Sequence, residues 1–374
     1  MEDSHDIQSF LNIINESLSE WKDVKLEEVE FHLLPSMTNT VYKVVCRNSD
    51  IRPNPIIFRK FFQGHGIIDR PKERKLFLEV ARVGYGPKCY FENEKYRIEQ
   101  WIESNPMKGH EYNENPENRR RLARAVAKFH RIQVPWIKPA RYLPNDIDNE
   151  SFLKPFLEKY SKRELFTDKE YAAMEEMKKV ISPEEKEFIK KIFPKEEDLV
   201  LSHNDISLGN ALRYPDGSNI VLIDYEYAGK NFRGFDIGYL FHQGRLVRIP
   251  DPPCFRFNDD NFPSDDDLRE FIEYYIVFSD ISEEQEKLVG EQIINDYSSF
   301  KEYLKNNYEE DKFSSRVEDL LFQTKLGVLA CNFYIVTWAI TMSKVKPGKF
   351  DHIEFAKCGY EYYCRYRKEL SDMH

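Results

Sequence analysis

The chain lacks the cysteine patterns that mark a disulfide framework or a metal centre. Its six cysteines include no C-x-x-C pair, and they form no cluster with histidine of the kind that holds zinc. Scattered cysteines of this sort are typical of proteins whose thiols stay reduced in the cytosol. The sequence therefore predicts a cytoplasmic protein with free thiols.

Targeting and membrane signals are also missing. The start of the chain, residues 1–4, carries neither the basic nor the apolar block of a signal peptide. The longest apolar segment, residues 326–340, is interrupted by Asn332 and is shorter than the roughly 20 residues that a membrane span requires. We expect a buried helix there and no transmembrane segment.

Positive charge is scarce relative to negative charge. The chain has 55 Lys and Arg against 65 Asp and Glu, a formal net charge of -10 at pH 7 and a pI near 5.6. This balance argues against nucleic acid or an anionic membrane surface as a partner. An acidic field suits a cationic substrate instead.

The size and patterning of the chain indicate two lobes. With 374 residues, 41% of them hydrophobic and 14% aromatic, the chain can bury a large core. Strand patterns prevail up to residue 104, and helical patterns follow. We expect an N-terminal lobe of residues 1–104 and a mainly helical C-terminal lobe of residues 105–374, with no internal repeat or low-complexity linker.

Two acids and an amide in the middle of the chain lie at the ends of short predicted strands. A short strand at 199–201 precedes a loop with Asp205 and Asn210, and a hairpin with a Pro-Asp-Gly turn then leads to Asp224. Phosphoryl transfer requires an aligned hydroxyl and magnesium that bridges the phosphates. We predict Asp205 as the catalytic base, and Asn210 and Asp224 as ligands of Mg²⁺.

A less specific interpretation exists for the start of this segment. A lone His-Asn-Asp triplet is usually a turn with a local side-chain hydrogen bond. The spacing from Asp205 to Asn210 and Asp224 favours the catalytic interpretation. His203 is predicted to be structural, because Asp205 already fills the role of the base.

The same segment resembles the choline and ethanolamine kinases, which are relatives of the aminoglycoside phosphotransferases. The protein-kinase signature is H-R-D, four residues, Asn and then D-F-G. Here Asn204 stands at the middle of the triplet, and residues 224–227 read Asp-Tyr-Glu-Tyr, so a protein kinase is disfavoured. Asn231 and the Phe-Asp-Ile run at 235–237 complete the resemblance, which extends from residue 34 to residue 365.

The resemblance implies a fold, an activity and two cofactors. The fold is a two-lobed, protein-kinase-like fold of the α+β class, with a small β-rich N-terminal lobe. The activity is ATP-dependent, Mg²⁺-dependent phosphorylation of choline to phosphocholine, an early step of phosphatidylcholine synthesis. Asp236 would then be structural, its carboxylate holding the backbone of the loop around Asp205. Alternatives are an ethanolamine kinase and a non-catalytic kinase-like binding protein.

Glycine is missing where such kinases cover the phosphates. Residues 35–39 are predicted to form a turn between two strands, and related kinases have glycines at the first two places, which here are Pro35 and Ser36. Close approach of the backbone to phosphate is therefore less assured. The residues expected to contact the nucleotide here are Ser36, Met37, Thr38 and Asn39.

The next strand, at 56–61, carries two adjacent cations. Neighbouring side chains of a strand face opposite ways, so only one of Arg59 and Lys60 can point into the cleft. The resemblance favours Arg59, whose guanidinium suits phosphate oxygens, and makes Glu73 its ion-pair partner. Glu79 remains open as the partner, and both cations could instead be solvated.

Two further features of the N-terminal lobe follow from local signals. A helix is expected to begin after Asp69 as its N-cap, with Pro71 in the first turn, and to end at Gly84. The resemblance places the hinge between the lobes at residues 96–102. Adenine would bind the backbone around Gln100 and Ile102 there.

The amine pocket is where the sequence departs most from the resemblance. A quaternary ammonium is best held by aromatic faces with carboxylates nearby. The predicted substrate-binding residues are Glu226, Tyr227, Gln243, Ile335, Trp338, Phe350 and Phe355. For each aromatic ring among them, packing in the core is the alternative.

Two positions of this pocket differ from the family pattern. Choline kinases usually show W-G-L-W, and here Ile335 replaces the first Trp. The family's N-H-F-x-E motif reads Tyr239 to Gln243, so an amide replaces a carboxylate. Weak choline binding or a changed amine preference would follow, since a primary ammonium donates three hydrogen bonds and tolerates the loss of an aromatic wall. The oligomeric state stays open, and a homodimer is one possibility.

Overall fold

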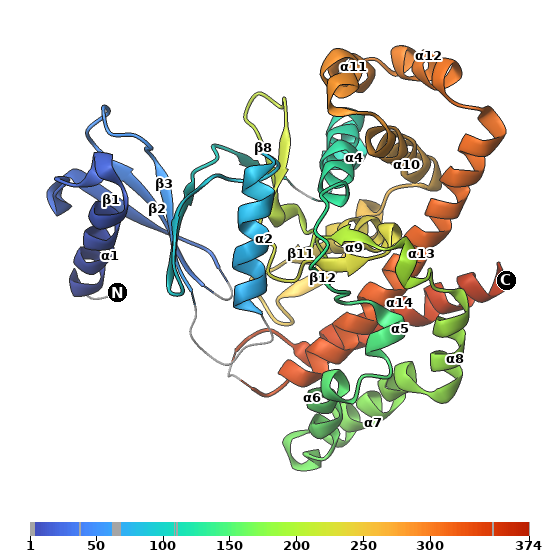
Figure 1. The fold of residues 1–374 in the computed structure, drawn as a ribbon. Coiled ribbons are helices and arrows are strands. Elements are labelled where there is room, and N and C mark those ends of the chain that lie inside the picture. The colour runs from blue at the N-terminus through green and yellow to red at the C-terminus, as the bar shows by residue number, and fades with distance from the viewer. Residues whose placement is uncertain are drawn as a thin grey trace. The chain divides into compact units, whose positions relative to one another are not determined.

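A computed structural model of the chain describes residues 4–36, 39–61, 69–107, 109, 111–345 and 348–373 (Figure 1). The chain divides into two compact units. Unit 1 comprises Met1–Asn105 and Leu212–Glu226, and unit 2 comprises Pro106–Ala211 and Tyr227–His374. A segment from the middle of the chain thus groups with the N-terminal residues, whereas the sequence predicts one boundary after residue 104. The assignment of separate roles to residues 1–104 and 105–374 stays a prediction.

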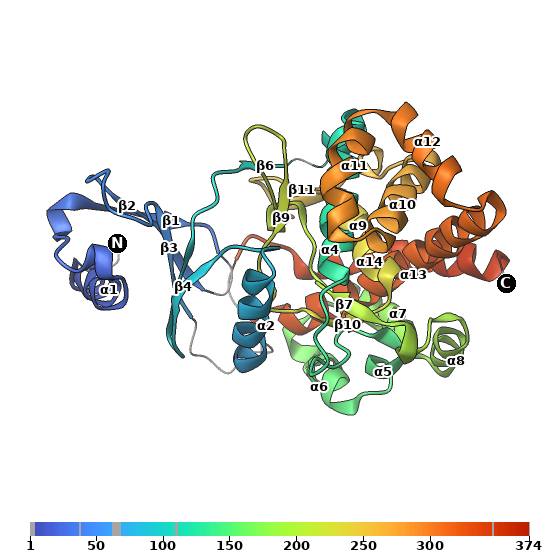
Figure 2. The same cartoon turned by 45° about the horizontal axis from the view of Figure 1, so that its top comes forward.

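Unit 1 is built on an antiparallel sheet. Its strands lie in the order β1-β2-β3-β5-β4. Their bounds are Val29–Leu34 for β1, Thr40–Cys46 for β2, Ile56–Lys60 for β3, Cys89–Glu92 for β4 and Tyr96–Gln100 for β5. One face of this sheet is covered by helix α1, Ser4–Ser17 (Figure 2). The Phe10 ring of α1 lies 5.0 Å from the ring of Phe58 and 5.9 Å from that of Tyr42, so helix and sheet share one apolar core.

Helix α2, Arg70–Arg82, also belongs to unit 1 and confirms the predicted start and stop signals. The Asp69 side chain accepts a hydrogen bond from the backbone N–H of Lys72, as an N-cap does. Gly84 follows the helix at a φ of 75°, a left-handed conformation that favours glycine.

The hairpin that leads to Asp224 is present as predicted. Strands β6 (Asn105–Pro106), β8 (Ala211–Arg213) and β9 (Ile220–Leu222) form a sheet in the order β6-β8-β9. Between β8 and β9, the N–H of Gly217 donates to the carbonyl of Tyr214 over 2.9 Å, and Gly217 has a φ of 72°. The hairpin turn is therefore formed by a hydrogen bond and a backbone conformation of the turn residues themselves.

Unit 2 is mainly helical. Its helices are α3 (Glu111–Glu114), α4 (Pro116–His130), α5 (Leu143–Asp146), α6 (Glu150–Tyr160), α7 (Asp168–Met177), α8 (Pro183–Ile192), α9 (Arg233–Gly244), α10 (Asp265–Asp280), α11 (Glu283–Asn295), α12 (Tyr297–Asn307), α13 (Glu310–Met342) and α14 (His352–Asp372). Two short antiparallel pairs accompany them, β7 (Val200–Ser202) with β10 (Gly229–Asn231), and β11 (Leu246–Arg248) with β12 (Phe255–Phe257).

Helix α13 runs from the outer edge of unit 2 inward and packs against α9 and α14 (Figure 1). Among the described helices it is the one long and apolar enough to cross a membrane, but 78% of its most apolar window is buried inside the protein. Residues 326–340 thus form the buried helix that the sequence predicts. A methyl group on Gly327 would lie 2.2 Å from the carbonyl oxygen of Gly234 in α9, so glycines let these two helices approach closely.

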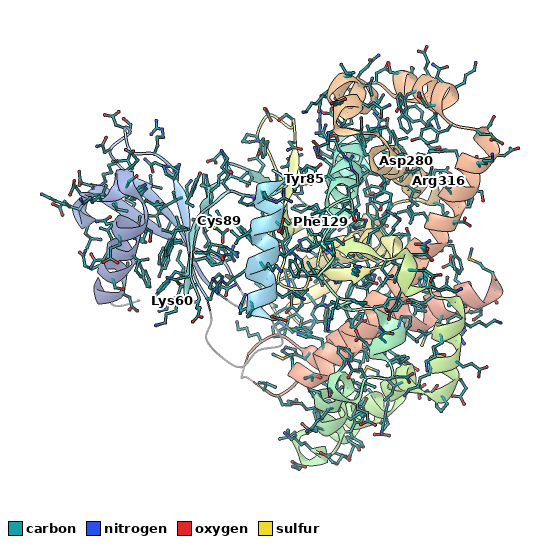
Figure 3. All side chains as sticks on the ribbon, viewed as in Figure 1. Lys60, Tyr85, Cys89, Phe129, Asp280 and Arg316 are labelled. Atoms are coloured by element: carbon teal, nitrogen blue, oxygen red, sulfur yellow. The ribbon has the colours of Figure 1, made fainter. Side chains whose placement is uncertain are left out.

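An ion pair fastens the amino-terminal part of α13 to the end of α10. The Arg316 guanidinium donates to both carboxylate oxygens of Asp280, over 2.8 and 2.9 Å (Figure 3). The Tyr308 hydroxyl donates to the same carboxylate over 3.2 Å. These bonds position α13, which carries two of the predicted amine-pocket residues, Ile335 and Trp338.

Candidate active site

The loop between β7 and β8 carries Asp205 and Asn210, both in unit 2. The carbonyl of Asp205 accepts hydrogen bonds from the backbone N–H of Ser207 and from Nδ2 of Asn210, each over 2.9 Å. The Asn210 amide is thereby oriented, and its Oδ1 accepts no hydrogen bond within the part of the chain that the structure describes. Asn210 therefore presents a free amide oxygen, which suits a hard cation.

Asp236, at the start of α9, anchors this loop. Its carboxylate accepts from the backbone N–H of His203 over 2.6 Å and from that of Asn204 over 2.8 Å. It also pairs with Nε2 of His130 at 3.0 Å, and both side chains are fully buried. Burial lowers the pKa of His130 although Asp236 opposes the shift. The prediction that Asp236 holds the loop backbone is confirmed.

His203 has a structural environment, as predicted. Its ring is fully buried and lies 5.6 Å from the ring of Phe129 in α4 (Figure 3). The acid of the triplet, in contrast, keeps 25% of its side chain exposed. Within the triplet, therefore, Asp205 is accessible to a small molecule and His203 is not.

Asn204, which replaces the arginine of the protein-kinase signature, joins the loop to the segment before α5. It has a φ of 63°, and its Nδ2 donates to the carbonyls of Ala140 and Tyr227 over 3.0 and 3.1 Å. The amide of Asn231 donates to Oδ1 of Asn204 and to the carbonyl of Arg141, each over 2.9 Å. These bonds explain why two asparagines stand at these places.

Two residues that sequence reasoning missed lie against Asp205. The Tyr239 hydroxyl of α9 donates to Oδ1 of Asp205 over 2.5 Å. The Nη1 atom of Arg141 lies 3.9 Å from the same oxygen, and it donates to the carbonyl of Asn204 over 2.7 Å. The departure from the family motif at Tyr239 was a signal for one of them. Nothing in the local pattern around Arg141 points to the other.

In unit 1, the predicted pairing of Arg59 with Glu73 is wrong. Arg59 Nε donates to Glu99 Oε1 over 2.6 Å, and Glu73 instead pairs with Arg97 over 2.8 Å. Arg97 also donates to Glu99 over 2.9 Å, so the four side chains form one chain of ion pairs. Because Arg97 lies opposite Arg59 in the β3–β5 register, it comes between Arg59 and α2.

This network sets the ionisation of its members. Burial alone would raise the pKa of Glu99, but the Arg59 and Arg97 guanidinium groups outweigh it and lower that pKa to about 2. Burial alone would lower the pKa of Arg59, and Glu99 above all, with Asp224 and Glu73, raises it instead. Asp224 is thus one of the acids whose charge acts on Arg59.

The two cations of β3 face opposite ways, as predicted. Arg59 points to the Glu99 side, where only 12% of its side chain is exposed. Lys60 Nζ lies 5.3 Å from the ring centre of Phe10 in α1, on the other face (Figure 3). The strand alternation therefore selects Arg59 as the cation that shares a face with Glu99.

The predicted phosphate turn is described in part. Met37 and Thr38 lie outside the described residues. Ser36 Oγ accepts from the N–H of Asn39 over 3.2 Å. The Asn39 side-chain oxygen accepts from Arg70 over 2.9 Å, so an arginine that the sequence analysis did not select lies beside this turn. Arg70 is the first residue of α2, where a cation opposes the helix dipole. This unfavourable position was a signal in the sequence that Arg70 has another role.

Glu226 is the last residue of its segment of unit 1, and Tyr227, which is also predicted for the amine pocket, follows it in unit 2. Its carboxylate is 3.4 Å from Arg70 Nη1, and 6% of the side chain is exposed. At the predicted hinge, the N–H of Gln100 donates to the carbonyl of Lys88 over 2.9 Å, and Ile102 is buried. The Gln100 N–H is therefore engaged, and adenine binding by Gln100 or Ile102 stays a prediction.

Three of the predicted aromatic residues gather near α14. The ring of Phe355 lies 6.3 Å from Trp338 and 5.4 Å from Phe350. Tyr227 lies elsewhere in unit 2, and the Arg141 guanidinium covers its ring at 4.0 Å. The Phe350 ring likewise carries a guanidinium, that of Arg248, at 5.2 Å. Two of the four predicted cation-binding rings thus contact a cation of the chain itself.

The two positions that differ from the family pattern are both packed. Ile335 is 6% exposed, and its Cγ2 lies 2.6 Å from where a methyl group on Gly359 of α14 would be. Gln243 Nε2 lies 3.8 Å from the sulfur of Cys331. Their contact with a substrate stays a prediction.

No cluster in the described residues resembles a metal centre of three or more His, Cys, Asp and Glu side chains. Mg²⁺ does not require one, because it is usually held by one or two protein oxygens, phosphates and water. An amide oxygen such as that of Asn210 is a ligand of this kind. Asn210 belongs to unit 2 and Asp224 to unit 1, and their sharing of one ion stays a prediction.

Comparisons with known proteins agree with this geometry. A profile of the choline/ethanolamine kinase family matches residues 32–364. The human protein named choline/ethanolamine kinase is 25% identical over 308 residues, which span 81% of this chain and 69% of that protein. Choline kinase A2 of Caenorhabditis elegans is 23% identical over 389 residues, covering 94% of this chain and 83% of that one.

The fold has solved counterparts. The crystal structure of choline kinase from Cryptosporidium parvum superposes with a TM-score of 0.72 at 19% identity, covering 98% of this chain and 97% of that chain. The Plasmodium vivax ethanolamine kinase gives a TM-score of 0.64 at 18% identity, covering 96% and 88%. The predicted two-lobed, protein-kinase-like fold is confirmed.

The fold and the Asp205 loop define a small-molecule kinase that uses ATP as its phosphate donor. The chain belongs to the choline/ethanolamine kinase family.

Proposed function

We propose that the protein phosphorylates choline with ATP and Mg²⁺, with an amino alcohol as the class of substrate. The accessible Asp205 carboxylate, on a loop anchored by Asp236, is the observation that carries this proposal. The hydroxyl oxygen of choline attacks the γ-phosphorus, and the bond from that phosphorus to the β–γ bridging oxygen breaks. The hydroxyl proton passes to Asp205, and phosphocholine and ADP leave.

In this proposal Asp205 accepts the substrate hydroxyl through its Oδ2 oxygen. Its Oδ1 accepts the Tyr239 hydroxyl, whereas Oδ2 accepts no hydrogen bond from any residue in the described ranges. A carboxylate oxygen left open in this way can accept the hydroxyl of the substrate and align it for attack.

Asn210 and Asp224 are the proposed ligands of Mg²⁺. The side-chain hydrogen bond of Asn210 leaves its Oδ1 free, and Asp224 has a left-handed φ of 69°, a strained conformation of the kind found at functional sites. Asn210 and Asp224 would hold the ion, and the positive charge it supplies when bound would neutralise charge that develops during transfer.

The nucleotide contacts are proposed for unit 1. Arg59 would bind phosphate oxygens, held in place by Glu99. Glu73 would act on it only indirectly, through Arg97. The remaining proposed contacts are Ser36, Met37, Thr38, Asn39, Gln100 and Ile102. A cytoplasmic location and a homodimer stay predictions.

Ethanolamine is the second candidate substrate, and a specific observation favours it. Guanidinium groups already cover the rings of Tyr227 and Phe350, so fewer aromatic faces are free for a quaternary ammonium. A primary ammonium relies on hydrogen bonds instead.

A transfer assay with labelled γ-phosphate tests both candidates. The acceptor panel contains choline, ethanolamine, their methylated intermediates and an aminoglycoside, and the Asp205→Asn variant gives the background. We expect the highest kcat/KM with choline. A preference for ethanolamine would select the second candidate, and no transfer to any amino alcohol would contradict the proposed function.

A further inference from the structure

We propose that Tyr239 and Arg141 are positioning residues, which hold the Asp205 carboxylate by Oδ1 and so direct Oδ2 to the acceptor hydroxyl. This inference rests on the proposed function of Asp205. Tyr239 stands where the family motif N-H-F-x-E has asparagine, so the arrangement is a property of this chain.

The Tyr239 phenol is held rigidly. Its ring stacks on that of Phe235, one turn earlier in α9, with 5.9 Å between centres and 30° between planes. From there its hydroxyl reaches Asp205 Oδ1 over 2.5 Å. Burial above all, with the nearby Asp205 charge, raises the pKa of Tyr239 well above its usual range. The phenol therefore stays protonated and acts as a hydrogen-bond donor.

The Arg141 guanidinium is fixed from three sides. Its backbone is in the left-handed region, with a φ of 50°, and its carbonyl accepts from the Asn231 amide over 2.9 Å. The side chain donates to the Asn204 carbonyl over 2.7 Å and lies 4.0 Å from the ring centre of Tyr227. Arg141 thus belongs to the same bonded framework that holds the Asp205 loop.

The distance between Arg141 and Asp205 decides what this arginine does. Its Nη1 lies 3.9 Å from Oδ1, beyond the 2.7 to 2.9 Å that is typical of a charge-assisted hydrogen bond. The guanidinium therefore attracts Oδ1 electrostatically without donating a hydrogen bond to the carboxylate. Since Tyr239 and Arg141 both act on Oδ1, they resist rotation of the carboxylate and keep Oδ2 in one direction.

Loss of this orientation should lower turnover more than binding. A misplacement of about 1 Å in a reacting group can cost about a hundredfold in rate. For Tyr239→Phe we expect kcat to fall by roughly tenfold to a hundredfold, with KM for ATP and for the amino alcohol within about twofold of the wild type. The retained ring should leave Tm near that of the wild type.

Tyr363→Phe is the matched control. Tyr363 is another buried tyrosine of unit 2, and its hydroxyl donates to a different carboxylate, that of Glu185, over 2.7 Å. Its removal deletes the same atom without touching Asp205. We expect kcat to stay near the wild-type value in this variant.

Conservative and non-conservative changes at Arg141 separate positioning from folding. Arg141→Lys keeps a cation near Oδ1 and a donor for the Asn204 carbonyl, whereas Arg141→Gln keeps no charge. We expect Arg141→Lys to retain several-fold more kcat than Arg141→Gln at a similar Tm. If kcat followed Tm across both variants, Arg141 would be merely structural, and its part of the inference would be overturned.

The outcomes distinguish this inference from the proposed function. Wild-type turnover of an amino alcohol with an unchanged kcat in Tyr239→Phe would overturn the positioning role alone. If the wild type phosphorylates none of the amino alcohols, the proposed function fails, and the rate of ATP hydrolysis, with water as acceptor, then tests Tyr239. A lowered rate in Tyr239→Phe supports positioning, and an unchanged or absent rate overturns it.

Discussion

Two carboxylates, Glu99 in unit 1 and Asp205 in unit 2, differ in the charge of their hydrogen-bond donors. Glu99 has two arginine partners, at 2.6 and 2.9 Å, and only 5% of its side chain is exposed. Asp205 accepts a neutral phenol at 2.5 Å, has its arginine at 3.9 Å and keeps 25% of its side chain exposed. One carboxylate is thus neutralised by cations, and the other is only held in place.

The difference teaches how an acid can be kept available for chemistry. A buried carboxylate that is paired with two guanidinium groups is stabilised as an anion and has little capacity left for a substrate. A carboxylate that is held by a phenol through one oxygen keeps its charge and its second oxygen. Asp236 is a third case, since it is fully buried and bonds mainly to backbone N–H groups.

The largest expected effect comes from removing the available carboxylates. Asp205→Asn and Asp224→Ala should each lower kcat by at least about a hundredfold, because general base catalysis and metal binding contribute that much. Steady-state kinetics with a melting curve measures this. Near-normal turnover in either variant would remove the proposed mechanism.

Asp236→Ala should act on stability instead. It leaves the buried N–H groups of His203 and Asn204 without their acceptor, and each unsatisfied group costs about 1 to 3 kcal/mol. The free energy of unfolding should therefore fall by about 3 kcal/mol or more, as urea denaturation would show. An unchanged midpoint would mean that Asp236 does not anchor the loop.

The contribution of Glu99 to the free energy of unfolding should depend on pH. Its pKa is lowered from 4.5 to about 2 in the folded protein, so its contribution to stability is present above about pH 4.5 and is lost as pH falls towards 2. A shift of this size corresponds to about 3 kcal/mol. Unfolding free energies of the wild type and Glu99→Gln, measured between pH 6 and the lowest pH at which both fold, should converge as the solution becomes acidic. A constant difference would contradict the shift.

The smallest expected effect compares the two cations of β3. Arg59→Lys keeps a positive charge beside Glu99 but loses the guanidinium fork, so it should raise KM for ATP by roughly tenfold and leave KM for the amino alcohol almost unchanged. Lys60→Ala should do little, since Lys60 lies on the opposite face against Phe10. The reverse ranking of the two variants would mean that Lys60 is the cation that binds phosphate.

Local patterns in the sequence were enough for several features of the molecule. The cap at Asp69, the turn at Gly217 and the opposite faces of Arg59 and Lys60 were all predictable, because neighbouring residues fix backbone angles and side-chain directions by themselves. The spacing of Asp205 and Asn210 and the resemblance around them pointed to the right family for the same reason. These signals lie within a few residues of one another.

Pairings between distant elements were not predictable. The resemblance assigns Glu73 to Arg59, but in the structure Glu73 of α2 pairs with Arg97 of β5. No local pattern indicates that Arg141 lies near Asp205, because that contact depends on hydrogen bonds by which Asn204 and Asn231 join a distant segment to the loop. The sequence alone determined which residues this protein has available for phosphoryl transfer. Only the tertiary structure decided which cation neutralises which acid, since that choice follows from distances that local backbone geometry does not set.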